Sequence, residues 1–122
     1  MKNYHFKTIS KQVLGDLHTP VSIYLKVRDI YPESALLESS DFHGNENSLS
    51  FIALCPLASI GINNGECTAT FPDGNREVTP LSESYNVADA MNAFLSRYSI
   101  EGADKKICGL FGYTAFDAVR YF

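Results

Sequence analysis

A carboxylate and a hydroxyl stand side by side at Glu38 and Ser39, directly after the apolar pair Leu36 and Leu37. The apolar pair favours a short buried strand, so the two polar side chains would lie at its carboxyl end. In open α/β architectures ligands usually bind at that end, and a carboxylate beside a hydroxyl can hold an ammonium group. The ordinary alternative is a solvated strand end and a turn hydroxyl, and these residues alone favour it.

Catalytic motifs are absent from the rest of the sequence. It contains no nucleophile elbow, no phosphate-binding glycine loop and no pair of ligands at a metal-binding spacing. The three cysteines, Cys55, Cys67 and Cys108, are widely spaced and odd in number, which fits neither a disulfide framework nor a metal site. Each lies among apolar or small residues, so we predict three buried free thiols in a reducing cytoplasm.

The composition fits one soluble domain over residues 1–122. Hydrophobic residues make up 45% of the chain and charged residues 20%, which is ordinary for a globular protein. The net charge of -4, without a cluster of lysine or arginine, argues against nucleic acid as a partner. No apolar run approaches membrane-spanning length, so no membrane association is expected.

The candidate residues depend on elements that local patterns predict. Alternating aromatic residues at Tyr4 and Phe6 suit a short edge strand. Thr19 is a good helix cap and Pro20 a favoured first helical residue, which predicts a helix over residues 20–30. The apolar alternation in that range would also suit a strand, and the period alone leaves both open. The strand with the candidate site follows over residues 34–39.

Residues 48–79 are predicted to form an antiparallel meander. The segment 48–55 has the pattern of a core strand that ends before Pro56. Asn64 and Gly65, between two apolar runs, are a strong hairpin signal because both residues tolerate positive φ. A second turn at residues 72–75 returns the chain into a strand over residues 76–79.

The last third of the sequence predicts two helices and a strand. Asn86 can cap a helix over residues 87–98 in which Arg97 faces outward and an apolar face packs inward; that face comprises Val87, Ala90, Met91, Phe94, Leu95 and Tyr98. Residues 105–113 contain the apolar core of a buried strand, and a short helix over 115–120 follows Thr114. The fold class is therefore α+β, an antiparallel or mixed sheet with helices packed on it.

Four segments, in the family's order, resemble the amino-terminal domain of the large, chorismate-using subunit of anthranilate synthase (component I). They are a threonine-proline-valine helix at residues 19–29, a leucine-leucine-glutamate-serine signature at 36–39, a serine-phenylalanine-isoleucine strand at 50–56, and a glycine-rich segment at 109–113 with residues 117–122. The resemblance implies a single amino-terminal regulatory domain over 1–122, cut from a longer chain. It also implies that this domain belongs to a larger chorismate-utilising α/β sandwich.

The resemblance further implies an effector site. In this family the signature lines the site at which free L-tryptophan binds and inhibits the enzyme. Carried over, Glu38 and Ser39 would contact the amino-acid end of tryptophan, and Leu37 would help to enclose the indole. Ser48 stands where the family usually has a basic residue, which changes how the polar end of the ligand is completed.

The same resemblance places catalysis outside this sequence. In the family a carboxyl-terminal domain binds chorismate and Mg²⁺, and it forms anthranilate and pyruvate with ammonia delivered from glutamine by an amidotransferase subunit (component II). We therefore expect no catalytic residue, metal or cofactor in this chain. The expected partners are L-tryptophan, the carboxyl-terminal domain, the amidotransferase subunit and a second copy of the chain.

Two alternatives remain open from the sequence. The large subunit of aminodeoxychorismate synthase has a similar glycine-leucine-phenylalanine-glycine-tyrosine segment, although the intact signature at residues 36–39 favours anthranilate synthase. The chain could also be a free-standing domain that binds an amino acid and regulates without an attached enzyme.

Overall fold

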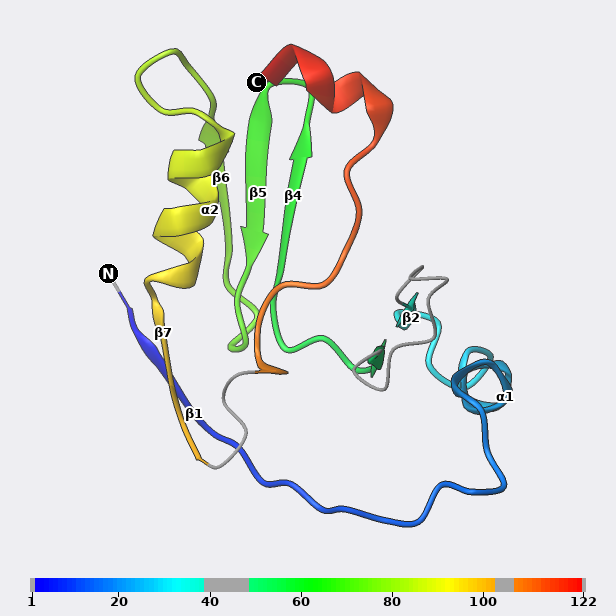
Figure 1. Cartoon of the computed structure of the whole chain (residues 1–122). Coiled ribbons are helices and arrows are strands. Elements are labelled where there is room, and N and C mark those ends of the chain that lie inside the picture. Colours follow the sequence, from blue (N-terminus) through cyan, green and yellow to red (C-terminus); the bar gives the residue numbers. More distant parts are fainter. Residues whose placement is uncertain (1, 39–48, 103–106, 122) are drawn as a thin grey trace. The chain divides into compact units, whose positions relative to one another are not determined.

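The computed structural model describes residues 2–38, 49–102 and 107–121 (Figure 1). The chain divides into two compact units. The larger unit combines Met1–Lys11 with Leu57–Phe122, and the smaller unit is Gln12–Pro56. A run of five strands, paired antiparallel, lies between the two α-helices, and one parallel pair joins β1 (Tyr4–Lys7) to β7 (Tyr98–Glu101), which confirms the α+β class predicted from the sequence. Among the described residues, no helix combines the length and apolarity needed to cross a bilayer.

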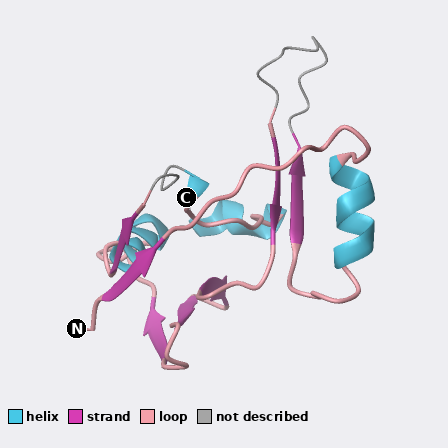
Figure 2. Cartoon of the chain, turned by 90° about the horizontal axis from the view of Figure 1, so that it is seen from below, coloured by secondary structure: helices cyan, strands magenta, loops and turns pink. Residues whose placement is uncertain are grey.

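The smaller unit consists of a helix beside a two-stranded antiparallel ribbon (Figure 2). Helix α1 (Pro20–Val27) begins with a capping box in which Thr19 Oγ1 accepts the Ser22 N–H at 3.1 Å and Ser22 Oγ accepts the Thr19 N–H at 2.9 Å. The helix was thus predicted correctly over the competing strand. It ends at Val27, three residues before the predicted end, because residues 28–30 form a turn.

The ribbon pairs β2 (Ala35–Glu38) with β3 (Ser50–Ala53). The strand that carries the leucine-leucine-glutamate-serine signature is therefore present. The sequence analysis placed β3 in the meander, but β3 pairs with β2 instead. Cys55 has a φ of 51°, in the left-handed region, and Pro56 has no N–H to donate. These two residues interrupt the ladder before the next strand begins.

The larger unit contains the predicted meander, in the strand order β4-β5-β6. Its strands are β4 (Ser59–Asn63), β5 (Glu66–Thr70) and β6 (Arg76–Pro80). Asn64 and Gly65 turn the first hairpin with φ values of 51° and 77°, which confirms the predicted turn. The sequence prediction of a hairpin at this dipeptide is correct because both residues accept the left-handed conformation at low cost.

Helix α2 (Val87–Leu95) contacts β4 and β5 of this sheet. Its buried residues are Val87, Ala90 and Phe94, whereas Met91 and Leu95, predicted to face the core, are exposed. The helix ends at Leu95, so Tyr98 belongs instead to the strand β7 (Tyr98–Glu101). This strand was not predicted, because helical periodicity continues through Tyr98 in the sequence.

Strand β7 pairs in parallel with β1 (Tyr4–Lys7), the predicted edge strand (Figure 1). Aromatic rings from these strands form the core with the sheet and α2. Ring centroids lie 5.5 Å apart between Tyr4 and Phe71, 5.8 Å between Phe71 and Phe94, and 5.1 Å between Phe94 and Tyr98. This aromatic chain joins β1 to β7.

Three further sequence predictions about burial are wrong. The described part of the segment predicted as a buried strand, residues 107–113, is exposed and forms no strand. Its two glycines give it little strand preference, and no described strand pairs with it. Cys55 and Cys108 are exposed, and only Cys67 is a buried free thiol. Arg97, predicted to face outward, is 6% exposed.

The final helix is a 3₁₀ helix, η2 (Phe116–Tyr121), close to the predicted range.

Candidate functional site

Leu37 and Glu38, two of the residues predicted to form the site, lie on β2 within the described part of the chain. Leu37 is half-buried and lies opposite Phe51 in the register of the ribbon, and Glu38 is exposed opposite Ser50. No described residue forms an ion pair with Glu38. Ser39 and Ser48 lie outside the described residues. The described end of β2 therefore lies within the range that the pattern predicted. The contacts of Ser39 and Ser48 are not described.

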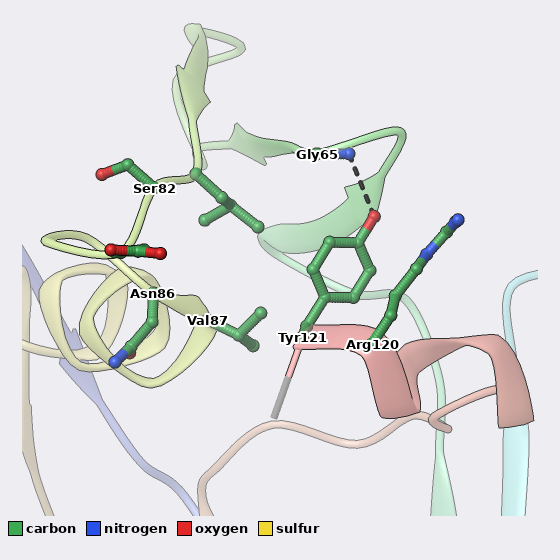
Figure 3. Close-up of a pocket in the computed structure, with 8 residues that line it drawn as sticks. Gly65, Ser82, Asn86, Val87, Arg120 and Tyr121 are labelled. Atoms are coloured by element: carbon green, nitrogen blue, oxygen red, sulfur yellow. Dashed lines mark hydrogen bonds between the residues drawn. The ribbon is translucent and has the colours of Figure 1, made fainter.

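A separate pocket of about 300 Å³ lies in the larger unit (Figure 3). Three segments line it: the turn after β4, the stretch that leads into α2, and the end of η2. The lining residues are Gly65, Leu81, Ser82, Glu83, Asn86, Val87, Arg120 and Tyr121. The sequence analysis did not find this pocket, because its walls are three stretches more than 15 residues apart that only the fold brings together.

The side chain of Tyr121 lines the pocket at the end of η2. Its hydroxyl oxygen accepts the Gly65 N–H at 3.0 Å, which holds η2 against the β4–β5 turn (Figure 3). The guanidinium carbon of Arg120 lies 5.3 Å from the centre of the Tyr121 ring. Figure 3 shows Val87 directed toward the ring from the opposite wall. The pocket thus combines an apolar wall with a cation at its edge.

Two of the polar groups on the lining already have partners. Asn86 Oδ1 accepts the Asp89 N–H at 3.0 Å as the cap of α2. Ser82 Oγ accepts the Tyr85 N–H at 3.1 Å and also contacts Ser84 Oγ. By contrast, Glu83 and Arg120 make no ion pair with each other or with another charged residue in the described part of the chain. These two charges are the groups that remain available to a ligand.

A buried arginine organises the other end of the larger unit. Arg97 Nη1 donates to Glu77 Oε2 at 2.9 Å, and Arg97 Nε donates to the Lys2 carbonyl at 3.0 Å. Its guanidinium carbon lies 4.0 Å from the centre of the Phe71 ring. These contacts tie the amino terminus to the sheet, so we assign Arg97 a structural role.

One carboxylate, that of Asp73, accepts several hydrogen bonds at the β5–β6 turn. Lys2 Nζ donates to Asp73 Oδ2 at 2.8 Å, and the Asn75 N–H donates to Asp73 Oδ1 at 3.0 Å. These hydrogen bonds lower the pKa of Asp73 from 3.8 to about 2. The described residues include no group of three or more histidine, cysteine, aspartate or glutamate side chains arranged to hold a metal ion.

Comparison with known proteins gives a consistent set of relatives. No family model and no solved structure matches the chain. Curated proteins named anthranilate synthase component 1 do match it. The protein from Pseudomonas putida is 35% identical over 124 aligned positions, covering 97% of this chain and 24% of the relative. The protein from Thermus thermophilus is 32% identical over 114 positions, covering 92% and 23%.

Over nearly all of its length the chain is similar to anthranilate synthase component 1. A further relative of that name, from Pseudomonas aeruginosa, is 31% identical over 97% of the chain. The matches cover the amino-terminal part of these proteins, and the chain spans about a quarter of their length. This relationship confirms the resemblance to component 1 found in the four sequence segments.

Proposed function

We propose that the chain forms the amino-terminal regulatory part of an anthranilate synthase component 1. The observation that carries this proposal is the common name of four curated relatives, which are 27–35% identical over 92–97% of the chain. The whole enzyme would be a cytoplasmic lyase that converts chorismate and ammonia to anthranilate and pyruvate, the first step of tryptophan biosynthesis. The same set of names favours it over aminodeoxychorismate synthase.

In this proposal the end of β2 supplies one side of a feedback site for L-tryptophan. The exposed Glu38 carboxylate can accept hydrogen bonds from the ammonium group of the ligand. Half-buried Leu37 offers apolar surface for the indole ring. Consecutive side chains of a strand point to opposite faces, so the ligand must lie across the end of the β2–β3 ribbon to reach both. Ser39 and Ser48, which flank the described strands, would complete the polar contacts.

Inhibition then follows from a population shift. Tryptophan must bind more tightly to an inactive arrangement of the enzyme than to the active one, because equal affinity would shift nothing. A coupling of about 1–3 kcal/mol is typical of allosteric effectors, and a few polar contacts made in only one arrangement would supply it. Glu38 and Ser39 are the groups proposed to make these contacts.

The catalytic apparatus lies outside this chain in the proposal. Chorismate and Mg²⁺ would bind to a carboxyl-terminal domain, and an amidotransferase subunit would deliver ammonia. The 122-residue chain alone is therefore expected to form no anthranilate from chorismate, Mg²⁺ and ammonium. Fluorescence of anthranilate measures this directly, and clear turnover by the isolated chain would contradict the assignment of catalysis elsewhere.

A chimaera tests the proposal as a whole. This chain replaces the matching amino-terminal quarter of the Pseudomonas putida enzyme. We expect the chimaera to form anthranilate and to be inhibited by L-tryptophan. Glu38→Gln and Ser39→Ala should relieve the inhibition and leave turnover without tryptophan nearly unchanged, whereas the matched control Glu33→Gln, exposed in the same unit, should remain inhibited.

The outcomes test the enzyme assignment and the tryptophan site separately. A folded chimaera that forms no anthranilate would argue that this chain does not belong with such an enzyme. Full inhibition of both Glu38→Gln and Ser39→Ala would instead reject the site and leave the enzyme assignment intact. The chain contains no tryptophan residue, so emission from added L-tryptophan reports its binding to the isolated chain without background. Tight binding there would favour the free-standing regulator.

A further inference from the structure

The turn between β4 and β5 contains Asn64, the only asparagine in the sequence that a glycine follows. The side-chain carbonyl carbon of an asparagine is electrophilic, and the backbone nitrogen of the next residue can attack it. Glycine permits this attack best because it has no side chain to block the approach. Asn64 is exposed to water, and no atom lies within 4 Å of the position that a Cβ at Gly65 would occupy. The turn therefore presents an accessible asparagine beside an unhindered nitrogen.

The fold holds the backbone of this turn in one conformation. Strands β4 and β5 pair up to the turn on both sides, and Asn64 has a φ of 51°, in the left-handed region. The Gly65 N–H donates to the Tyr121 hydroxyl oxygen at 3.0 Å (Figure 3), and the Gly65 carbonyl accepts the Leu81 N–H at 2.8 Å. The nitrogen that would attack Asn64 is thus the same atom that fastens η2 to the turn.

From these observations we propose that Asn64 is a site of spontaneous deamidation and that docking of η2 through Tyr121 slows the reaction. Attack requires the peptide plane between Asn64 and Gly65 to rotate toward the side chain, and this rotation carries the Gly65 N–H away from Tyr121. The intact hydrogen bond therefore opposes the reaction, and its loss favours it.

The reaction uses only water and hydroxide as co-reactants. Hydroxide removes the Gly65 amide proton, and the nitrogen then forms a bond to the side-chain carbonyl carbon of Asn64. The C–N bond of the side-chain amide breaks, and the departing group takes a proton from water, which releases ammonia and restores the hydroxide. One water molecule then opens the cyclic imide at either carbonyl, so the product is aspartate or isoaspartate.

Either product changes the turn. Aspartate adds one negative charge beside Glu66. Isoaspartate places an additional carbon in the main chain, which displaces the Gly65 N–H in a hairpin whose register allows two residues in the turn. Deamidation would therefore loosen the contact between Gly65 and Tyr121 that slowed it. The site lies in the larger unit and does not depend on the proposed tryptophan site.

Incubation of the folded chain at mildly alkaline pH tests the proposal, with peptide mass spectrometry to locate the lost amide. Tyr121→Phe keeps the ring and removes the acceptor oxygen, so it should raise the rate at Asn64 by about two- to tenfold, the worth of one neutral hydrogen bond. Tyr113→Phe is the matched control, because Tyr113 is 95% exposed, and it should react like the wild type.

The chain unfolded in urea tests the role of the fold. Asn64 should deamidate faster there than in the folded protein, and Gly65→Ala should slow it, because the added methyl group hinders the nitrogen. Asn63, which a larger residue follows, should keep its amide throughout. An isoaspartyl methyltransferase should label the aged wild type. Equal rates in the folded and unfolded chain, a wild-type rate in Tyr121→Phe, or an equal acceleration in Tyr113→Phe would overturn the proposal.

Discussion

Replacing Arg97 with methionine should destabilise the larger unit more than any exposed substitution. Arg97 is 6% exposed, and its guanidinium donates to the Lys2 carbonyl at 3.0 Å and lies 4.0 Å from the centre of the Phe71 ring. A hydrogen bond from a charged group contributes about 1.5–3 kcal/mol, and a desolvated cation–π contact about 2 kcal/mol. The bond to Glu77 adds less, because the Glu77 side chain is 54% exposed.

These contributions overlap, so we expect the free energy of unfolding to fall by about 2–4 kcal/mol in Arg97→Met. With a urea dependence of about 2 kcal/mol per molar, the unfolding midpoint should drop by about 1–2 M. Circular dichroism and tyrosine fluorescence report the transition, since the chain has no tryptophan.

Two further variants separate the contacts of Arg97. Glu77→Gln removes only the half-exposed ion pair and should cost less than about 1 kcal/mol. Arg97→Lys keeps the charge but loses the planar fork, so its stability should fall between that of the wild type and that of Arg97→Met. An Arg97→Met chain that unfolds within about 0.5 kcal/mol of the wild type, the usual range of neutral surface changes, would refute the structural role.

Three other predictions concern single sites. Gly102→Ala should lower the thermal midpoint, because Gly102 has a φ of 127° and an added Cβ would lie 2.6 Å from the Thr8 carbonyl; differential scanning calorimetry measures the loss. The folded-state pKa of Asp73 is lowered from 3.8 to about 2, chiefly by its hydrogen bond from Lys2, so the stability it contributes is complete above the higher value and disappears as pH falls through the lower one. Asp73→Asn should therefore flatten the decline of the thermal midpoint across that window, and an unchanged decline would count against the assignment. Burial raises the pKa of the Cys67 thiol, so a thiol reagent should modify the two exposed cysteines quickly and Cys67 only after unfolding in urea; equal rates would contradict its burial.

The sequence predicted best those features that short-range chemistry decides. The cap at Thr19, the cap at Asn86 and the turn at Asn64-Gly65 each depend on residues within about four positions of one another. The strand end at Glu38 follows from a local change from apolar to polar residues. All of these features are present in the structure.

The features that were missed depend on distant partners. Arg97 is buried because its donors reach Lys2 and Glu77, which lie 95 and 20 residues away. Strand β7 has only four residues, and its pairing with β1 cannot be found from its own pattern. Apolar residues at 107–113 suggested a buried strand, but no described strand is available to pair with it. The pocket beside η2 requires the meander to bring Gly65 to Tyr121, 56 residues apart.

The parallel pairing of β1 with β7 has a consequence for synthesis of the protein. Strand β1 is synthesised before β7, so Tyr4 cannot pair with Tyr98, its partner in the register, until Tyr98 has left the ribosome. The segment Gln12–Pro56 is made during that wait and belongs to the other unit. Contacts between such distant residues slow folding, so the nascent amino-terminal strand stays unpaired until β7 has been made. Its lysines, Lys2 and Lys7, place charges on this waiting edge, which is how natural strands resist premature association.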